Sequence, residues 1–266
     1  MTFTDCSFKG GLDLRILLTN DDGITAPGIQ ALWRELSTLG EITVVAPDSE
    51  RSATSQAITV HQPIRVDQYC LEDPAICAWR IVGTPTDCVK IALEALMKER
   101  PDVVVSGINQ GPNMGTDVLY SGTVSAAIEG ALHGIPAVAV SLNAWEPADF
   151  GPAARFTRKL VSTLMERSLP PNTLLNVNVP ALPAEKLTGV EVTRLGVIEY
   201  ENTFERRQDP RGRIYYWMGG SLVDGHNEEG TDVAAVKAGK ISVTPVHFDL
   251  TNYGIMHLIE EWNLAT

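Results

Sequence analysis

The chain has 266 residues, of which 44% are hydrophobic and 20% charged, and its formal net charge is -12 at pH 7. This length allows one large domain or two small ones, and the charge argues against a protein that grips the nucleic-acid backbone. No apolar run reaches the roughly 18 residues of a membrane span. The first residues show no apolar signal-peptide core, so we expect a cytoplasmic protein without a membrane partner.

The first predicted strand, at residues 16–18, is followed by two adjacent carboxylates, Asp21 and Asp22. A glycine comes next, and a helical period of apolar residues begins shortly afterwards. Acids at the carboxyl end of such a strand stand where open α/β sheets bind ligands, and adjacent like charges favour a bound cation. The pair is therefore a candidate metal site. The alternative is a polar turn in which an aspartate caps the following helix.

An amphipathic helix is expected over residues 25–40, and a short strand at 42–46. This strand–helix–strand unit predicts parallel pairing of the two strands. The polar segment 48–56 leaves the second strand and should lie beside the acid pair if the strands are neighbours. Ser52 could then reach the site, although most serines in such loops are simply solvated.

A β-rich hairpin over 57–82, a helix from Thr84 to about residue 99 and a strand at 102–106 come next. The loop after that strand is rich in glycine and carries Asn109 and Asn113. So many glycines indicate tightly bent backbone or close approach of a ligand. The asparagines add neutral oxygens and amide donors to this candidate site.

Ser121, Gly122 and Thr123 precede a helix expected over residues 124–133. Hydroxyls, free backbone amides and the positive end of the helix dipole together make a seat for a phosphate or another anion. An isolated Ser-Gly-Thr would more often be a plain helix cap. Here it follows a Gly/Asn loop that itself leaves a buried strand, and this favours the anion seat.

The rest of the chain is expected to hold a strand at 137–141, a helix at 153–166 and a strand at 174–179. At least five strand–helix repeats predict an α/β fold: a Rossmann-like three-layer core with a mostly parallel sheet, plus a smaller β-rich C-terminal part. The predicted divisions are residues 1–185 as catalytic core, with 1–13 as a flexible leader, and 186–266 as oligomerisation region.

Three extended segments are expected in the C-terminal region, with a charged loop and a short final helix. Residues 214–218 read Ile-Tyr-Tyr-Trp-Met, an apolar ribbon with too little around it to form a core. Packing against a second subunit would cover such an edge. Folding back on its own core is the alternative. The extended segments are expected at 190–193, 214–217 and 241–245, the charged loop at 201–212 and the final helix at 258–262.

Several long motifs of this chain resemble those of the SurE (survival protein E) family of metal-dependent nucleotidases. They are LLTNDDG at 17–23, Ser52 in its loop, GINQGPNMG at 107–115 and YSGT at 120–123. The resemblance runs from about residue 14 to 249, and GTPTDCV at 83–89 and GTDVAAV at 230–236 also look familial. One departure is Ala53, where the family usually has glycine after the serine.

This resemblance implies a site and an activity. It implies one divalent ion per subunit. The all-oxygen ligand set suits Mg²⁺, Mn²⁺ or Ca²⁺, and Mg²⁺ or Mn²⁺ is the expected ion. It further implies hydrolysis of nucleoside 5′-monophosphates to nucleoside and phosphate, leaves 3′-monophosphates open, and implies a homodimer or homotetramer with exchanged C-terminal elements. The implied residues are Asp21, Asp22, Ser52 and Asn109 for the metal, Asn113, Ser121, Gly122 and Thr123 for phosphate, and Asp21, Asp22 and Asn113 for catalysis.

Two other functions compete with a phosphomonoesterase. A receiver-type regulator also pairs acids at a first strand end, but it needs a phospho-accepting aspartate after the third strand. Here the strand at 102–106 ends in Ser-Gly-Ile-Asn, which disfavours that class. A non-catalytic regulatory protein that binds metal and nucleotide is disfavoured by the intact four-ligand set.

Overall fold

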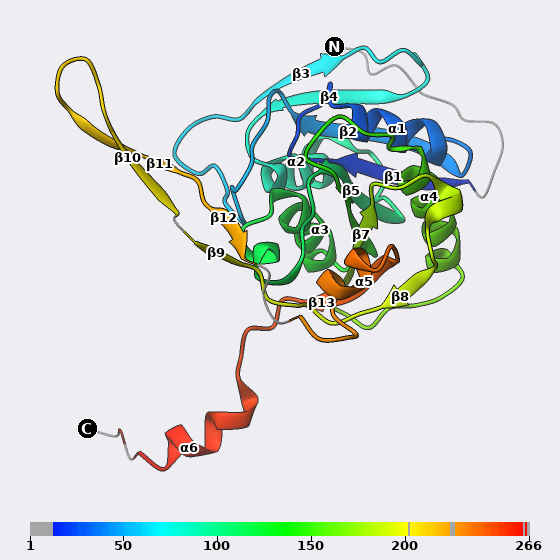
Figure 1. Cartoon of the computed structure of the whole chain (residues 1–266). Helices are drawn as coiled ribbons and strands as arrows, with labels where there is room; N and C mark the ends of the chain where they lie inside the picture. Colours follow the sequence, from blue (N-terminus) through cyan, green and yellow to red (C-terminus); the bar gives the residue numbers. More distant parts are fainter. Residues whose placement is uncertain (1–12, 202, 224–226, 263, 265–266) are drawn as a thin grey trace.

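A nine-stranded sheet forms the centre of the molecule in the computed structural model, which describes residues 13–201, 203–223, 227–262 and 264 (Figure 1). The predicted leader, apart from its last residue, lies outside the described residues. The six central strands, which are β4, β2, β1, β5, β6 and β7, run parallel. Strands β3 and β13 pair antiparallel with their inner neighbours β4 and β7. In spatial order the strands are β3 (Arg65–Tyr69), β4 (Cys77–Val82), β2 (Gly40–Pro47), β1 (Leu14–Thr19), β5 (Val103–Gln110), β6 (Ala137–Asn143), β7 (Thr173–Pro180), β13 (Ile241–His247) and β8 (Val190–Val192).

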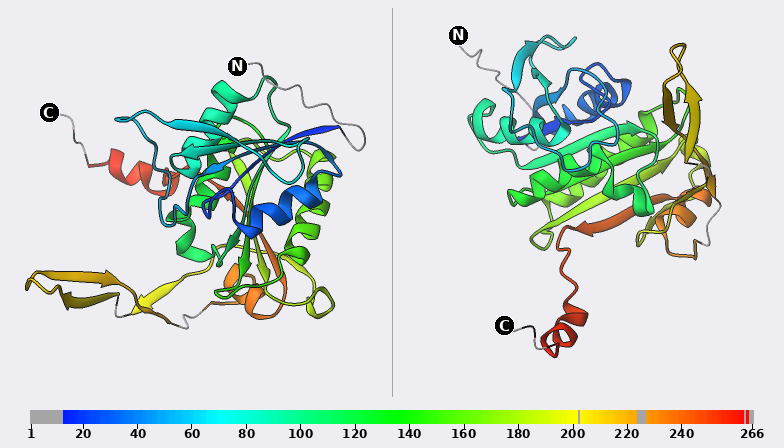
Figure 2. Two further views of the ribbon diagram at one scale, coloured as in Figure 1. Left: turned by 90° about the horizontal axis from the view of Figure 1, so that it is seen from above. Right: turned by 90° about the vertical axis from the view of Figure 1, so that its left-hand side faces the viewer.

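Helices cover both faces of this sheet and complete three layers (Figure 2). On one face, α1 (Pro27–Leu36) and α4 (Gly151–Met165) bury their apolar sides in one core cluster. On the other face, α2 (Pro85–Ile91) and α3 (Gly122–Leu132) share a second cluster. The predicted three-layer α/β fold is therefore confirmed.

Local sequence signals explain where the first helices begin and end. Helix α1 starts at Pro27, and its apolar residues face the core as their spacing predicts. Helix α2 begins with a capping box, in which Thr84 and Asp87 each accept a hydrogen bond from the other's backbone N–H. The single helix expected to about residue 99 instead ends in a π-helical turn, η1 (Ala92–Leu96).

The direction of winding changes between β1 and β5. From β1 the chain passes to β2 on one side, and from β5 it passes to β6 and β7 on the other. In open α/β sheets this switch point leaves a crevice at the carboxyl ends of the strands, and ligands bind there. The acid pair follows β1 and the Gly/Asn loop follows β5, so the winding brings both to this crevice.

The region after residue 185 contributes to the sheet and also extends away from it. Strands β8 and β13 belong to the nine-stranded sheet, whereas two short antiparallel pairs lie outside it. The segment expected as a charged loop contains β10, and the helix α5 was not expected. These additional elements are η3 (Ala184–Lys186), β9 (Glu199–Glu201), β10 (Phe204–Gln208), β11 (Ile214–Met218), β12 (Ser221–Val223), α5 (Asp232–Lys237), η4 (Tyr253–Ile255) and α6 (Met256–Glu260).

Two segments project from the core, the ribbon (β10–β11) and the tail (residues 250–262) (Figure 1). Large apolar side chains on both are exposed. Within the described part of the chain, no helix is long and apolar enough to cross a membrane. The exposed side chains include Phe204, Ile214, Tyr215, Tyr216, Trp217 and Met218 on the ribbon, and Leu250, Tyr253, Ile255, Met256, Leu258 and Trp262 on the tail.

Candidate functional site

The acid pair lies in a closed turn directly after β1. The side chain of Asn20 donates to the carbonyl of Gly23 at 2.8 Å and accepts from its N–H at 3.2 Å. These two hydrogen bonds close the turn and present both carboxylates at the carboxyl end of the strand. Asp21 is only 5% exposed, whereas Asp22 is half-buried.

The loop after β2 packs against this turn, as expected for neighbouring parallel strands. The N–H of Ile24 donates to the carbonyl of Pro47 at 2.9 Å, and the N–H of Arg51 donates to the carbonyl of Asp21 at 2.7 Å. Ser52, the next residue, is exposed and donates its hydroxyl to Glu50 at 2.6 Å. The loop thus lies beside the acids, while the Ser52 hydroxyl is turned toward Glu50.

The end of β5 forms the opposite side of the crevice. The N–H of Gln110 donates to Oδ2 of Asp22 at 3.2 Å. A shift in strand register between Ser106 and Asn109 changes the direction of this end. The Asn109 side-chain amide donates to the carbonyl of Gly111 at 2.7 Å, which leaves its oxygen available to a cation.

The first turn of α3 closes the site over Asp21. Gly122 lies so close that a Cβ there would be 2.9 Å from Oδ2 of Asp21. The Thr123 hydroxyl donates to Oδ1 of Asp21. Ser121 caps the helix by accepting the N–H of Val124 at 3.1 Å, so its own hydroxyl hydrogen stays available. The two hydroxyls therefore differ, since one orients an acid and the other can bind a ligand.

Asn113 is held by hydrogen bonds to buried residues of β6 and β7. Its N–H donates to Oδ1 of Asn178 at 2.9 Å, and its side-chain amide donates to the Ser141 hydroxyl at 2.8 Å. Its carbonyl accepts from the side chains of Asn176 and Asn178, each at 2.9 Å. One N–H of the Asn113 amide remains for a substrate oxygen.

These three supporting residues were absent from the candidates found in the sequence. Asn176, Asn178 and Ser141 are all fully buried. The available signal was the alternation Asn-Val-Asn-Val in the strand at 174–179, because asparagine in a buried strand requires hydrogen-bond partners.

The electrostatics of the acid pair favour a bound cation. Burial raises the pKa of Asp21, although the hydrogen bond from Thr123 acts in the opposite direction. Burial, and after it the nearby Asp21 carboxylate, raises the pKa of Asp22 to about 7. Two acids whose charged forms are disfavoured in this way gain from a positive charge between them.

The donor set fits a hard divalent ion. Among the described residues, no group of three or more His, Cys, Asp or Glu side chains gathers as a metal site. Neutral oxygens such as those of Asn109 and Ser52 would therefore complete the ligand set of the acid pair. Two carboxylates with neutral oxygens suit Mg²⁺ or Mn²⁺ rather than Zn²⁺, which prefers nitrogen and sulfur.

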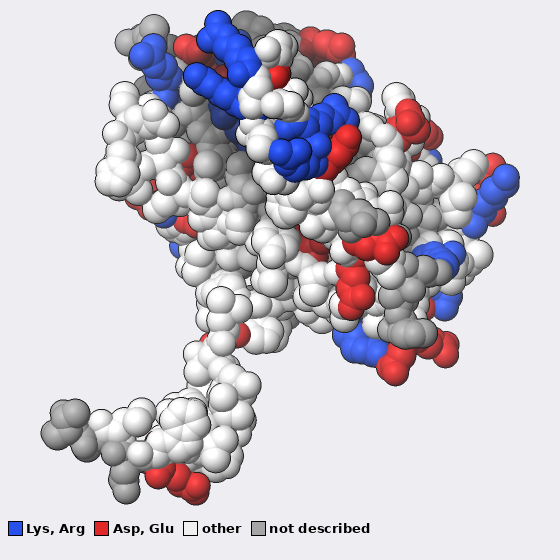
Figure 3. Space-filling view, turned by 60° about the vertical axis from the view of Figure 1, so that its left-hand side comes forward, with Lys and Arg blue, Asp and Glu red and all other residues white. Residues whose placement is uncertain are grey.

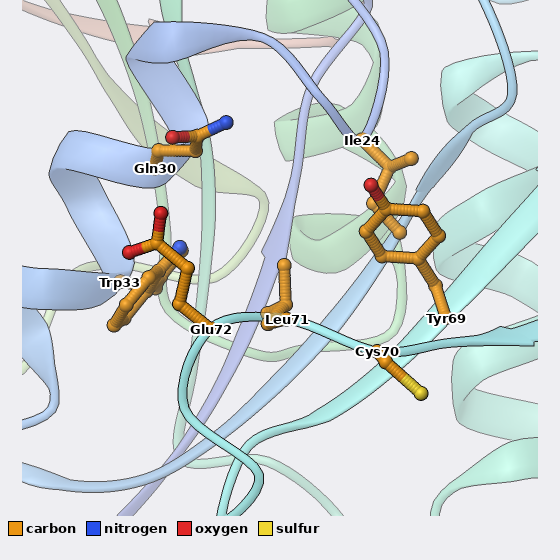
Figure 4. Close-up of a pocket in the computed structure, with 7 residues that line it drawn as sticks. All are labelled: Ile24, Gln30, Trp33, Tyr69, Cys70, Leu71 and Glu72. Atoms are coloured by element: carbon orange, nitrogen blue, oxygen red, sulfur yellow. The ribbon is translucent and has the colours of Figure 1, made fainter.

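A separate hollow of about 140 Å³ lies between α1 and the turn after β3 (Figure 4). Ile24, which follows the acid turn, forms part of its wall, and none of the predicted site residues lines it. Glu72 is the only carboxylate among its lining residues. The hollow therefore lacks the paired acids of the site at the switch point.

The fold and this site define a doubly wound α/β protein in which an acid pair meets the first turn of a helix at the carboxyl edge of the sheet. The chain belongs to the SurE family, since the model of that family, described as survival protein SurE, matches residues 16–202. The family expected from the motifs is thereby confirmed.

Individual relatives support this assignment over nearly the whole chain. A protein of Heliobacterium modesticaldum named 5′-nucleotidase SurE is 57% identical over 94% of this chain and 92% of its own length. One of Carboxydothermus hydrogenoformans with the same name is 51% identical, covering 94% and 96%. The crystal structure of the SurE protein from Aquifex aeolicus superposes with a TM-score of 0.82 at 40% identity, covering 94% of this chain and 99% of that one.

Proposed function

We propose that this protein is a divalent-metal-dependent phosphomonoesterase that hydrolyses nucleoside 5′-monophosphates to nucleoside and phosphate. The observation that carries the proposal is the contact between the buried Asp21 carboxylate and the first turn of α3, which sets a cation site against an anion site. The relatives named 5′-nucleotidase, at more than half identity, support the substrate class. Nucleoside 3′-monophosphates are a second proposed substrate class.

Asp21, Asp22, Ser52 and Asn109 are the residues that would hold the metal. When bound, the ion supplies Lewis-acid polarisation of a phosphoryl oxygen and activation of water. Thr123 contributes by fixing Asp21, because its hydroxyl donates to that carboxylate. Ser52 would exchange its hydrogen bond to Glu50 for the metal, which only requires rotation of an exposed side chain.

The phosphoryl group would lie between Asn113 and the first turn of α3. The Ser121 hydroxyl, the backbone N–H of Gly122 and the positive end of the helix dipole, to which Thr123 belongs, all favour negative charge there, although the backbone N–H of Thr123 also contacts Asp21. Asn113 adds one amide N–H from the opposite side, held in place by Ser141. Fixed donors of this kind stabilise the charge that develops in the transition state.

We also propose that the region after residue 185 assembles subunits into a homodimer or homotetramer with exchanged C-terminal elements. The ribbon and the tail both carry exposed apolar side chains, and the tail is mostly uncharged surface in Figure 3. Trp262 on the tail is 57% exposed, and Trp217 on the ribbon 58%. Burial against a second subunit would remove both from water.

Release of phosphate from AMP tests the activity directly. With Mn²⁺ the parent should turn over 5′-AMP, and with excess EDTA it should not. Asp22→Asn should abolish turnover while the circular dichroism spectrum stays parental, because the charge that holds the cation is lost. Asp67→Asn, on an exposed surface ion pair with Arg80, is the control and should stay active. Turnover unaffected by EDTA, or by Asp22→Asn, would overturn the proposal.

A further inference from the structure

Asp232 is a fully buried carboxylate at the start of α5 that joins three segments of the chain. Its Oδ2 accepts the N–H of Gly115 at 2.8 Å. Its Oδ1 accepts the N–H of Gly196 at 2.7 Å and that of Val233 at 2.9 Å. Three backbone donors thus compensate for its burial. Asp232 lies in the GTDVAAV motif, which the proposed chemistry does not use.

Gly115 begins the short turn η2 (Gly115–Leu119), which connects Asn113 to Ser121. Its φ of +52° lies in the left-handed region, and a Cβ there would be 2.8 Å from the carbonyl oxygen of Gly196. The loop at 111–121, called the phosphate loop below, therefore touches the segment that leads to the ribbon, backbone to backbone, at Gly115 and Gly196. Only glycine combines this conformation with so close an approach.

Two further contacts extend this junction. The Thr116 hydroxyl donates to the carbonyl of Ile198 at 2.9 Å, and the Tyr200 hydroxyl donates to Oδ2 of Asp117 at 2.6 Å. Partial burial, followed by the contact with Asp117, raises the pKa of Tyr200 to about 12, so this phenol remains a donor at neutral pH. Each of the three consecutive residues 115–117 therefore makes a hydrogen bond to the C-terminal region.

We propose that Asp232 is a positioning residue for catalysis, which holds Gly115 so that Asn113 keeps its place beside the phosphoryl group. This rests on the proposed function, in which Asn113 binds that group. The buried asparagines of β7 hydrogen-bond to Asn113, and Asp232 holds the backbone of Gly115, two residues further along the chain. A shift of about 1 Å in a positioned group can cost on the order of 10²-fold in rate.

The substitution Asp232→Asn separates the loop contact from the others. An amide can accept on one side only, and Oδ1 faces two donors whereas Oδ2 faces one. The amide oxygen should therefore stay toward Gly196 and Val233, and the NH₂ group would face the N–H of Gly115. The bond to the phosphate loop is then lost selectively.

A double-mutant cycle with Asn113→Ala tests whether Asp232 acts through Asn113. Asp232→Asn should lower kcat for AMP by about tenfold or more in the parent, and by less than about twofold in the Asn113→Ala background. Asp102→Asn is the matched control, because Asp102 accepts the N–H of Arg15 at 2.8 Å at the opposite end of the sheet. It should change the melting temperature without changing kcat.

The outcomes distinguish the inference from the function on which it rests. If Asn113→Ala lowers kcat but the two effects multiply, Asp232 has a structural role only and the inference is overturned alone. If Asn113→Ala leaves kcat at the parental value, the phosphate site and the inference fail together. Should Asp232→Asn not fold, Tyr200→Phe replaces it in the same cycle, because Tyr200 is 46% exposed. A smaller fall in kcat that vanishes without Asn113 supports the inference, and a multiplicative one overturns it.

Discussion

The backbone of Gly122 lies directly on the carboxylate of Asp21. A Cβ at residue 122 would stand 2.8 Å from the Cβ of Asp21 and 2.9 Å from its Oδ2, closer than unbonded atoms of this kind approach. The absence of a side chain thus lets the first turn of α3 meet the proposed metal ligand. The backbone N–H groups at the start of α3 are for this reason neighbours of the acid pair.

Gly122→Ala should therefore reduce turnover without unfolding the protein. Alanine is favoured over glycine within a helix by up to about 1 kcal/mol, so α3 itself should not suffer. The added methyl group must displace Asp21 or the helix, and we expect kcat to fall on the order of 10–10²-fold. Steady-state release of phosphate and the melting temperature are the measurements.

Gly130→Ala provides a control in the same helix. A Cβ there would be 2.8 Å from Cγ2 of Val104 in the core, far along α3 from Asp21. This variant should lose thermal stability and keep its kcat per folded molecule. Parental kcat in Gly122→Ala would contradict the close packing that we assign to the site.

Metal affinity should depend on pH through Asp22. Its pKa in the metal-free protein is about 7, so below this pH a proton occupies the carboxylate and must be displaced. The dissociation constant for Mn²⁺ should rise by up to about tenfold for each pH unit below 7 and level off above it. The metal-free fold should also lose stability as the pH rises from about 4 to 7, because the folded state holds this proton more tightly than the unfolded one.

Titration calorimetry in two buffers of different ionisation enthalpy measures both effects. Proton release on binding Mn²⁺ should be larger at about pH 6 than at about pH 8. Asp22→Asn should remove the difference together with most of the affinity. Equal affinities at the two pH values in the parent would show that Asp22 is ionised without the metal.

The sequence predicted the parts of the molecule whose signal is local. The helical period after Pro27 and the short β-branched strands led to the doubly wound sheet, and the acid pair at a strand end led to its crevice. The carboxyl ends of parallel strands share one edge, and the pairing of β1 with β5 sets Asp22 beside Gln110 at that edge. The segment before Ser52 was placed by the same reasoning, and its backbone does contact Asp21.

The remaining parts depend on contacts between distant segments. Ser141 and Asn178 support Asn113 from 28 and 65 residues away, which no spacing within one motif reveals. Strand β10 was expected as a loop because its five residues are all exposed and carry no buried apolar face to mark it. Strand β13 joins the main sheet although it lies far beyond the predicted division at residue 185.

Ser121 and Thr123 should respond differently to substitution, since only Thr123 donates to Asp21. Ser121→Ala removes a helix cap, at about 1 kcal/mol of stability, and one donor to the phosphoryl group, at roughly 10²–10³-fold in kcat. Its affinity for Mn²⁺ should stay parental. Thr123→Val keeps the shape of the side chain but frees Asp21, so Mn²⁺ affinity should change as well. Calorimetry and kinetics on both variants decide the matter, and identical metal affinities in the two would refute this division of roles.

The ribbon should be needed for assembly and not for folding of the core. Tyr216 and Trp217 are 59% and 58% exposed in the single chain, so replacing both with serine removes no buried core contact. If the ribbon packs on a second subunit, the double variant should shift from dimer or tetramer toward monomer in light scattering after size-exclusion chromatography. Arg206→Ser is the matched control, because Arg206 pairs with Tyr216 across the ribbon and is not apolar. A parent that elutes as a monomer at micromolar concentration would refute the assembly and leave the exposed ribbon without a partner.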